Sequence, residues 1–421
     1  MNLPGALVDL AADVSIDRGC GGDLLFNLGT VRKSGGTGTS TINSVFNNFG
    51  LLEVQVGTIS LNGGGSGGNG AVFRAEVGAT LKVAASYAAN SGSQFTGDGT
   101  NLLSSGTFTL NGLVTGSNAR LSGATLAGTN GIIAGVMTWT SGLFASGSTL
   151  TIAANGLLQL AGNNGSDYYL YGTLTNAGTL RLLSGNLQLY CSPGYLLNLP
   201  GALVDLAGDV SIDRGCGGDL FVNLGTVRKS GGTGTSAINP TFNNFGLLDA
   251  QTGLVNLNGN YTLAGGALNF GLTSLTNFGR IRLSGSPAVL AGTLGANLNN
   301  GYLPNVGAAF PLLSYSSASG VFANLNLPGG TAWQTNYGST VFTLSRSSGP
   351  PTLGFGSTPA WGTNGFRFAV DGQIGQAYIL QASTNLVNWV PVLNFTCTNS
   401  PTYVTDPGAK SFIWRFYRVA Q

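Results

Sequence analysis

Histidine is absent from all 421 residues, and charged residues make up only 8% of the chain. The missing imidazole excludes Ser-His-Asp and Cys-His nucleophile systems, histidine zinc sites and the commonest general base. The charges, 17 basic and 15 acidic, form no basic stripe of the kind that follows a nucleic-acid backbone. No uncharged apolar run approaches the roughly 18 residues of a membrane helix. We therefore expect no nucleic-acid partner and no membrane span, and no motif indicates a cofactor.

Glycine, in contrast, is abundant, with 69 residues, where an average chain has about 7%. Hydrophobic residues still make up 43% of the chain, so the composition is not that of a disordered protein. Many glycines among short apolar runs are typical of short strands joined by tight turns.

The longest sequence feature is a duplication. Residues 198–245 repeat residues 2–49 with 42 of 48 positions identical, at an offset of 196 residues. Arg32 and Lys33, which we expect to be exposed, match their copies Arg228 and Lys229 as closely as buried positions do, which indicates a recent duplication without selection for chemistry. The duplicated stretch predicts a repeat architecture more than it predicts a site.

A finer period runs through and between the two copies. Glycines 156, 178, 201, 225 and 246 each precede a short alternating strand, with gaps of 22, 23, 24 and 21 residues. Strands at this interval are the signature of a parallel β-helix. The frame of leucine-rich repeats is absent, and antiparallel sandwiches do not return to one glycine at this interval. The sequence predicts an all-β chain, a β-solenoid of about 22 residues per coil.

The alternation of apolar and polar residues along each strand predicts which side chains point into the core and which point outward. We expect an inward row of Leu158, Leu160, Leu180, Leu182, Leu248 and Ala250, and an outward row of Gln159, Arg181 and Asp249. The coil at Gly201 breaks this phase, and a one-residue bulge after it, and after its copy Gly5, would return Val204 and Leu206 to the core.

Asparagines precede several turn glycines, at Asn48, Asn176, Asn244 and Asn277. Asparagine tolerates left-handed backbone and bonds its own main chain, so these residues are either simple turn formers or rungs of an asparagine ladder. Both alternatives stay open from sequence alone.

Domain boundaries follow from composition. Residues 1–346 are expected to form the solenoid, with cap coils at about 288–346 and irregular coils with longer loops at 66–146. Residues 347–352 form the predicted linker, and 353–421 a small C-terminal β-sandwich. In that module Trp389 and Phe416 alternate as core residues should.

Met1 aligns with the middle of a repeat, which would leave the first coil open. We therefore expect an N-terminally truncated chain, in which a missing signal peptide argues little against secretion. The open coil and the low charge also predict end-to-end self-association.

Three of the four cysteines lie in or beside the repeats. Cys20 and Cys216 are equivalent and about nine coils apart, roughly 43 Å at ~4.8 Å per coil, far beyond disulfide range. Cys191 precedes Cys216 by 25 residues, about one coil. We predict a Cys191–Cys216 disulfide, which fits an oxidising, extracellular setting.

Several segments resemble a known family. Gly225–Thr235, Thr149–Gly156, Leu174–Gly178 and the FNN-x-G turns are similar to autotransporter-like β-helix repeat proteins of Verrucomicrobia and Planctomycetes. The tail motifs, Leu380–Trp389, Thr405–Pro407 and Arg415–Val419, resemble a C-terminal module of secreted proteins from those bacteria. The resemblance implies secretion and a right-handed β-helix, and it carries no catalytic residues.

Carboxylates are the remaining side chains that could act as catalytic groups. Parallel β-helices often host pectin-lyase-like polysaccharide lyases and hydrolases, and the candidate acidic cluster is Asp205, Asp209, Asp213, Arg214 and Asp219, repeated in the first copy. Glycosidases need two carboxyls roughly 5–9.5 Å apart. These residues follow one another along one coil instead of lining up across coils, so solvated turn acids are the favoured interpretation. A calcium frame of the nonapeptide type is not met either.

Tyr168, Tyr169 and Tyr171 are candidates for stacking on sugars. The favoured hypothesis is a non-enzymatic, secreted or cell-surface structural or adhesin-like β-solenoid with a C-terminal sorting or attachment module. The alternatives are a carbohydrate-active enzyme or a carbohydrate-binding protein, and extracellular polysaccharide or cell-surface components are the expected partners.

Overall fold

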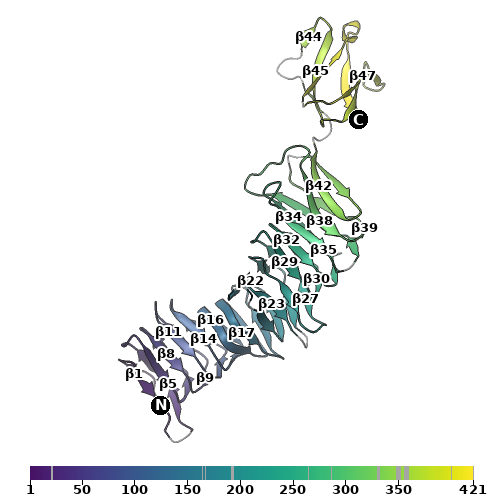
Figure 1. Ribbon diagram of the computed structural model, residues 1–421. Helices are drawn as coiled ribbons and strands as arrows, with labels where there is room; N and C mark the ends of the chain where they lie inside the picture. Colours follow the sequence, from purple (N-terminus) through teal and green to yellow (C-terminus); the bar gives the residue numbers. More distant parts are fainter. Residues whose placement is uncertain are drawn as a thin grey trace. The chain divides into compact units, whose positions relative to one another are not determined.

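A computed structural model shows a β-solenoid followed by a small β-sandwich, and both parts of the predicted fold class are confirmed (Figure 1). The structure describes residues 1–19, 22–163, 165, 167–190, 194–263, 265–285, 287–329, 332–347, 352–354, 360–399 and 401–420. The solenoid has about 12 turns of about 21 residues. No α-helix occurs among these residues, and hence no helix that could cross a bilayer.

Each turn contributes three short strands, and each strand pairs in parallel with the strand three positions along the chain. The result is three stacked sheets, here called faces 1, 2 and 3. Face 1 consists of β1 (Leu7–Leu10), β4 (Thr30–Lys33), β7 (Leu51–Val54), β10 (Val72–Ala75), β13 (Gln94–Thr96), β18 (Thr149–Ile152), β21 (Thr173–Asn176), β24 (Tyr195–Asn198), β27 (Leu220–Asn223), β30 (Thr241–Asn244) and β33 (Tyr261–Thr262).

Face 2 consists of β2 (Ser15–Ile16), β5 (Thr39–Ile42), β8 (Thr58–Leu61), β11 (Thr80–Val83), β14 (Thr100–Leu103), β19 (Leu157–Ala161), β22 (Thr179–Ser184), β25 (Leu203–Leu206), β28 (Thr226–Lys229), β31 (Leu247–Ala250), β34 (Ala267–Leu272), β37 (Thr293–Leu298) and β40 (Asn324–Asn326). Face 3 consists of β3 (Leu24–Asn27), β6 (Val45–Asn48), β9 (Gly65–Gly67), β12 (Tyr87–Asn90), β15 (Thr107–Asn111), β20 (Asp167–Leu170), β23 (Asn186–Leu189), β26 (Ile212–Arg214), β29 (Thr235–Ile238), β32 (Leu254–Leu257), β35 (Arg280–Leu283) and β38 (Ala309–Tyr315).

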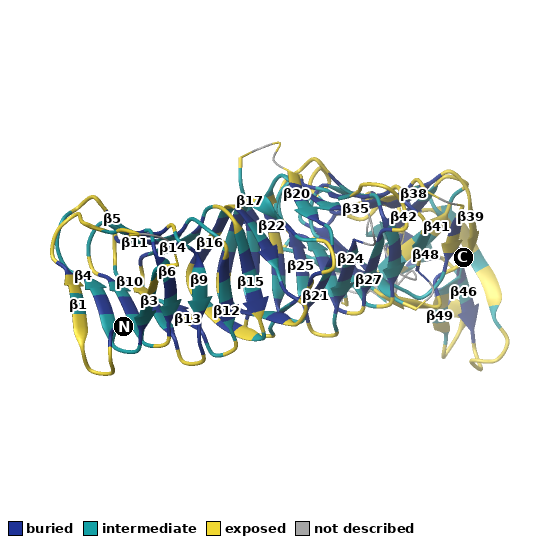
Figure 2. Ribbon diagram, turned by 90° about the horizontal axis from the view of Figure 1, so that it is seen from below, coloured by how far each residue is buried: buried dark blue, intermediate teal, exposed yellow. Residues whose placement is uncertain are grey.

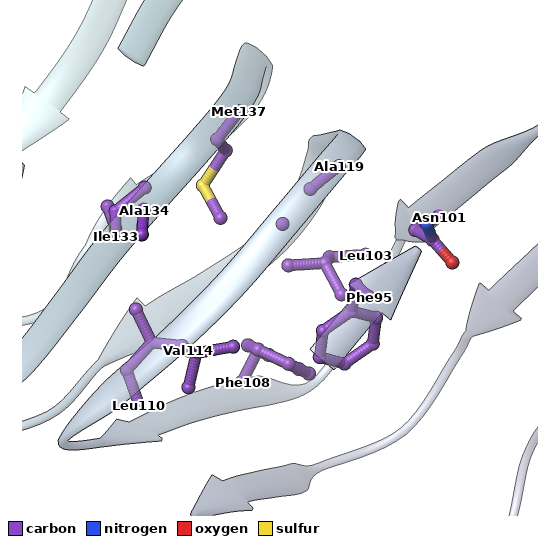
Figure 3. Close-up of a pocket in the computed structure, with 11 residues that line it drawn as sticks. Phe95, Asn101, Leu103, Phe108, Leu110, Val114, Ala119, Ile133, Ala134 and Met137 are labelled. Atoms are coloured by element: carbon purple, nitrogen blue, oxygen red, sulfur yellow. The ribbon is translucent and has the colours of Figure 1, made fainter. Parts of the chain in front are cut away.

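Two long strands, β16 (Leu113–Ala127) and β17 (Gly131–Phe144), each run across all three faces. Their mutual register shifts after Gly116, where the chain turns a corner. The longer loops predicted for residues 66–146 are wrong, because short turns join the strands from β9 to β15 and continuous strand crosses the corners in β16 and β17. The predicted irregularity is present in the register shifts between β16 and β17. An apolar cavity of about 20 Å³ remains between these turns, with Phe95, Val114, Ala134 and Met137 among its lining residues (Figure 3).

The core follows the predicted alternation (Figure 2). All six residues of the predicted inward row are fully buried. On the outside of face 2, Arg181 lies in register with Asp205, and Asp205 with Arg228. Asp249 also lies in the outward row, but Arg228 and Asn269 cover it and leave it 2% exposed.

Val204 and Leu206 are both buried, as expected. The register of β25 with β22 and with β28 is continuous, however, so the strand holds no bulge. The extra residue is Ala202, which sits in the turn after Gly201, where φ is +81°. The predicted bulge is thus absorbed before the strand begins.

The asparagines do form ladders. Asn176, Asn198, Asn223 and Asn244 are fully buried, and each side-chain amide donates to the next side-chain oxygen at 2.7–2.8 Å. A shorter ladder runs from Asn2 through Asn27 to Asn48 with both bonds at 2.7 Å. The ladder alternative is thus correct for these residues, whereas Asn277 is exposed. Each rung satisfies buried polar groups at a corner of the coil.

The two copies of the duplication lie on different faces. β1 belongs to face 1, whereas its equivalent β25 belongs to face 2. Counting β16 and β17 as three positions each, β25 lies 28 strand positions after β1, which is nine turns of three and one further position. The Asn27–Asn48 ladder accordingly lies on face 3 and its copy on face 1. The same sequence therefore fits two faces of one solenoid.

Parallel pairing continues through β36 (Ala288–Leu290) with β39 (Ala318–Gly320), and β41 (Ala332–Tyr337) and β42 (Val341–Ser347) form an antiparallel hairpin. Contacts divide the chain into two compact units, one of Met1–Leu272, Asn277–Asn297 and Leu313–Asn326, the other of Thr273–Thr276, Leu298–Leu312 and Leu327–Gln421. Residues 348–351 of the predicted linker lie outside the described residues, and the predicted boundary stays a prediction.

The C-terminal module pairs two antiparallel sheets. One contains β43 (Thr352–Gly354), β44 (Ala360–Gly362), β45 (Gly365–Asp371) and β48 (Thr402–Asp406), and the other β46 (Ala377–Ser383), β47 (Val390–Thr396) and β49 (Phe416–Ala420), with η1 (Ala409–Ser411) before β49. Phe368, Val370, Leu380 and Val404 form its core. Phe416 is 42% exposed, so its predicted core role is wrong. Its neighbour Tyr417 packs against the core instead.

Candidate functional site

Two buried lysines hold the coils of the duplicated segments. Lys33 is fully buried, and its Nζ donates to Asp13 Oδ1 at 2.7 Å, to Ser40 Oγ at 3.1 Å and to the Gly35 carbonyl at 2.8 Å. The expected exposure of this lysine is therefore wrong. The alternation of β4, with Val31 inward and Arg32 outward, places the lysine on the inner side.

The second copy repeats the arrangement. Lys229 is fully buried and donates to Asp209 Oδ1 at 2.9 Å and to Ser236 Oγ at 3.0 Å. A buried ammonium is tolerated because every donor has an acceptor and the charge is paired. Asp209 thus has a structural partner and is not a free carboxylate.

The predicted acidic cluster does not assemble. Asp205 lies on the outside of face 2, with its Oδ2 3.3 Å from Arg181 Nε. Asp219 is buried in the turn after β26, where it accepts a hydrogen bond from the Gly215 amide at 3.2 Å. Asp213 points outward from face 3. These carboxylates therefore belong to separate places around one coil.

Asp213 is part of a hydrogen-bonded row on face 3. Gln188 Nε2 donates to Asp213 Oδ2 at 3.3 Å and to Asp167 Oδ1 at 3.0 Å. On the other side the Asn239 amide donates to Asp213, and the Asn258 amide donates to Asn239 at 2.7 Å. Burial raises the pKa of Asp213, although the Asn239 donor favours its charged form.

The first copy repeats the part of this row that runs from Asp213 onward. The Asn43 amide donates to Asp17 Oδ1 at 2.6 Å, and the Asn62 amide to Asn43 at 2.9 Å. This row lies at the end of face 2, because the two copies differ by one face.

Three tyrosines lie beside the Asp213 row. The Tyr169 and Tyr171 rings are 6.1 Å apart with planes inclined by 25°, and Tyr190 stands across them at 5.5 and 5.3 Å. All three rings are half-buried at the outer surface. Tyr168 is fully buried instead, so this sugar-stacking candidate is wrong. Asp167 raises the pKa of Tyr169 by unfavourable charge interaction.

A polar hollow opens at this row, lined by Gln188, Asp213, Arg214, Asn239 and Asn258. Tyr169 is the register partner of Gln188, so the tyrosines border the hollow within one strand spacing. The hollow offers amide and guanidinium donors, carboxylate acceptors and aromatic surface in one place. This combination suits hydroxyl-rich ligands. We call these residues, with Asp167 and the three outer tyrosines, the tyrosine–amide face.

Tyr190, Gln188, Asn239 and Asn258 are absent from the residues predicted by sequence. Tyr190 follows Tyr169 by 21 residues, which is one coil, so the period itself marks it as a stacking neighbour. Tyr168 alternates with inward Leu170, which marks it as a core residue. Among the described residues, no three acidic or cysteine side chains converge as a metal site requires.

Cys216 is disulfide-bonded and lies in the exposed turn after β26. Its predicted partner Cys191 lies outside the described residues, and the pairing stays a prediction. Cys397, in the C-terminal module, is a free and buried thiol.

Comparison with models of known protein families finds none that matches this chain, and comparison with curated proteins also finds no match.

Proposed function

We propose that this chain is a non-enzymatic, adhesin-like structural β-solenoid of the cell surface or extracellular space, with a C-terminal attachment module. The observation that carries the proposal is the use of charge. Acids and bases pair between neighbouring coils, at the surface in Arg32–Asp9 at 3.0 Å and Arg228–Asp249 at 2.8 Å, and with a buried lysine in Lys33–Asp13. Carboxylates used in this way build a scaffold.

Carbohydrate binding at the tyrosine–amide face is a second candidate function. It is supported by the half-buried rings of Tyr169, Tyr171 and Tyr190 beside a hydrogen-bonding hollow. Aromatic rings supply apolar contact for sugar rings, and amides with carboxylates supply partners for hydroxyls. Tyr190 stands across the other two rings, so the face suits a bent or branched chain better than a flat one. The two carboxylates, Asp167 and Asp213, favour neutral sugars over acidic ones.

One experiment separates the candidates. The full chain is passed over a panel of immobilised neutral and acidic polysaccharides while released reducing ends are measured. We expect retention on neutral polysaccharide without new reducing ends, and loss of retention in the Tyr169→Ala/Tyr171→Ala variant. The matched control is Phe49→Ala, because Phe49 is an exposed aromatic stacked on Phe26 at 4.8 Å outside this face.

Release of reducing ends would support the competing enzyme hypothesis. A chain that is retained by no polysaccharide would remove the carbohydrate function and leave the structural one.

A further inference from the structure

One end of the C-terminal module gathers exposed apolar side chains. β46 runs toward this end, and Ser383 at its last position pairs with Phe416 at the first position of β49. The loop of residues 384–389 after β46 and the segment of residues 407–415 before β49 therefore emerge together. β45 begins at the same end, since Phe366 pairs with Asp406.

Large apolar residues from these segments are strongly exposed. Ile413 is 90% exposed, Val387 77%, Trp414 72% and Leu386 57%. Phe412 is 44% exposed, and Trp361, on the strand that pairs with the start of β45, is 59% exposed. We call these six residues the apolar end. A small water-facing module rarely keeps so many apolar side chains together without an interaction that uses them.

The apolar end is held in place from beneath. Arg415 Nε lies 3.2 Å from Asp406 Oδ2, and this carboxylate is 2% exposed. The Tyr417 hydroxyl donates to the same oxygen at 2.8 Å, and the Arg415 guanidinium covers the Phe412 ring at 4.1 Å. In the other loop, Asn385 Oδ1 accepts the amides of Val387 and Asn388 at 3.0 and 2.9 Å. These contacts hold the backbone of both loops in place, while the apolar side chains of the loops are exposed to solvent.

The exposed charges around the apolar end are positive. Lys410 in η1 is exposed, and Arg367 lies near the start of β45. The two carboxylates of the module's described part are Asp406, which is buried and paired, and Asp371, at the opposite end of β45. Cations beside an apolar centre fit a partner that combines negative charge with an apolar interior.

We propose that the apolar end docks on an anionic lipid surface. Side chains that stand more than 70% free, such as Ile413, Val387 and Trp414, project from the module instead of forming a flat patch. Projecting apolar groups suit a fluid phase that closes around them, whereas a protein partner needs a matching cleft for each. Tryptophan and lysine are residues that favour the level of the lipid headgroups. The inference rests on the proposed attachment role of the module and not on carbohydrate binding.

The test is sedimentation of the full chain with vesicles of phosphatidylcholine alone or mixed with phosphatidylglycerol. We expect binding to the mixed vesicles that weakens as salt rises, and a decrease of roughly tenfold or more in the Ile413→Ser/Trp414→Ser variant. The matched control is Ile374→Ser, because Ile374 is 64% exposed in the turn at the opposite end of the module. This control should bind as the native chain does.

Three results would overturn the proposal. These are no binding to either vesicle, equal binding by the Ile413→Ser/Trp414→Ser variant, and self-association of the native chain that this variant abolishes, which would make the end a protein interface. We expect the variant to fold, because both substituted positions are exposed, and circular dichroism checks this. The polysaccharide experiment is independent, so failure of lipid docking and failure of the carbohydrate function are distinguishable.

Discussion

Lys33 and Lys229 are charged residues that the chain keeps inside the protein, although it has few charges. Each ammonium is fully buried and reaches an aspartate, a serine hydroxyl and main-chain carbonyls. The lysine therefore links the loop that follows its strand to the preceding coil, at a position that apolar packing would leave with unpaired carbonyls. Arg32, one residue earlier, points outward and makes only a surface ion pair.

Replacement of Lys33 by methionine should lower the free energy of unfolding by about 2–3 kcal/mol, because it leaves an aspartate and carbonyls without their buried donor. The neighbouring Arg32→Met variant is the matched control and should lose much less, since its pair with Asp9 is exposed to water. Urea unfolding monitored by circular dichroism gives both values. Equal losses in the two variants would contradict a structural role for the buried ammonium.

The same pair predicts a pH dependence. The hydrogen bond from Lys33 lowers the pKa of Asp13 below its ordinary value of 3.8. A folded-state pKa below the unfolded one contributes stability above the unfolded pKa, and this contribution is lost as pH falls through the folded value. The native chain should therefore lose stability below about pH 4 more steeply than the Asp13→Asn variant. Melting temperatures from pH 6 to pH 2 should converge at the acid end, and parallel curves would argue against the assignment.

Among the elements, β16 and β17 differ most from their neighbours. Each turns the corners of the coil within one continuous strand, with positive-φ glycines such as Gly123 and Gly142 inside the strand, and an apolar cavity lies beside them (Figure 3). Gly116 lines this cavity, and its register partner is Gly135 on β17. The two glycines look alike in sequence but have different surroundings.

The Gly116→Ala variant should raise stability by about 0.5–1 kcal/mol, since it adds a methyl group to the cavity and restricts the unfolded chain. The added carbon would lie 3.3 Å from Ala119 Cβ and no nearer than 3.9 Å to other atoms. The control Gly135→Ala should destabilise, because φ there is +77° and the new carbon would lie 2.0 Å from the Gly116 carbonyl. Thermal unfolding compares the two, and a destabilised Gly116→Ala would show that Ala119 cannot give way.

Sequence periodicity predicts most of this architecture. The glycine interval identified the parallel coils, and alternation identified inward residues such as Leu158 and Leu180. The same alternation also indicates inward positions for Lys33 and Tyr168, and the predictions that these two residues are exposed were wrong because they followed the usual preference of polar groups for water. The physical reason is that a buried polar tip needs only local partners, and these come from the neighbouring loop.

The candidate site was harder to predict than the fold. Its residues come from different coils, so it depends on register between strands about 21 residues apart, as for Tyr169 and Tyr190. Spacings vary between coils, and only the pairing of β20, β23 and β26 decides which side chains meet. The number of strands per turn, and hence the shift of the duplication by one face, had no signal in the local sequence.

In the whole solenoid, one turn is a unit that can be removed. Deletion of residues 226–246 takes away β28, β29 and β30 and joins Gly225 to Leu247, which reproduces the junction of Gly246 with Leu247. The variant should remain folded, because every remaining strand keeps its face and nearest-neighbour contacts dominate such stacks.

The control is deletion of residues 226–235, about half a turn, which moves inward residues to other positions on the coil. Circular dichroism and resistance to protease should distinguish the two deletions. A half-turn deletion as stable as the full-turn one would contradict strict three-strand registration.

The shift of the duplicated segment by one face bears on how such a chain engages its surroundings. The outward rows that begin at Asp17 and Asp213 are copies, yet they lie on faces 2 and 3 and so point in different directions. Two copies that point apart cannot rest on one flat surface together, so duplication brings no avidity there. A ligand bound at the Asp213 row would therefore leave the Asp17 row free and facing another part of the surroundings.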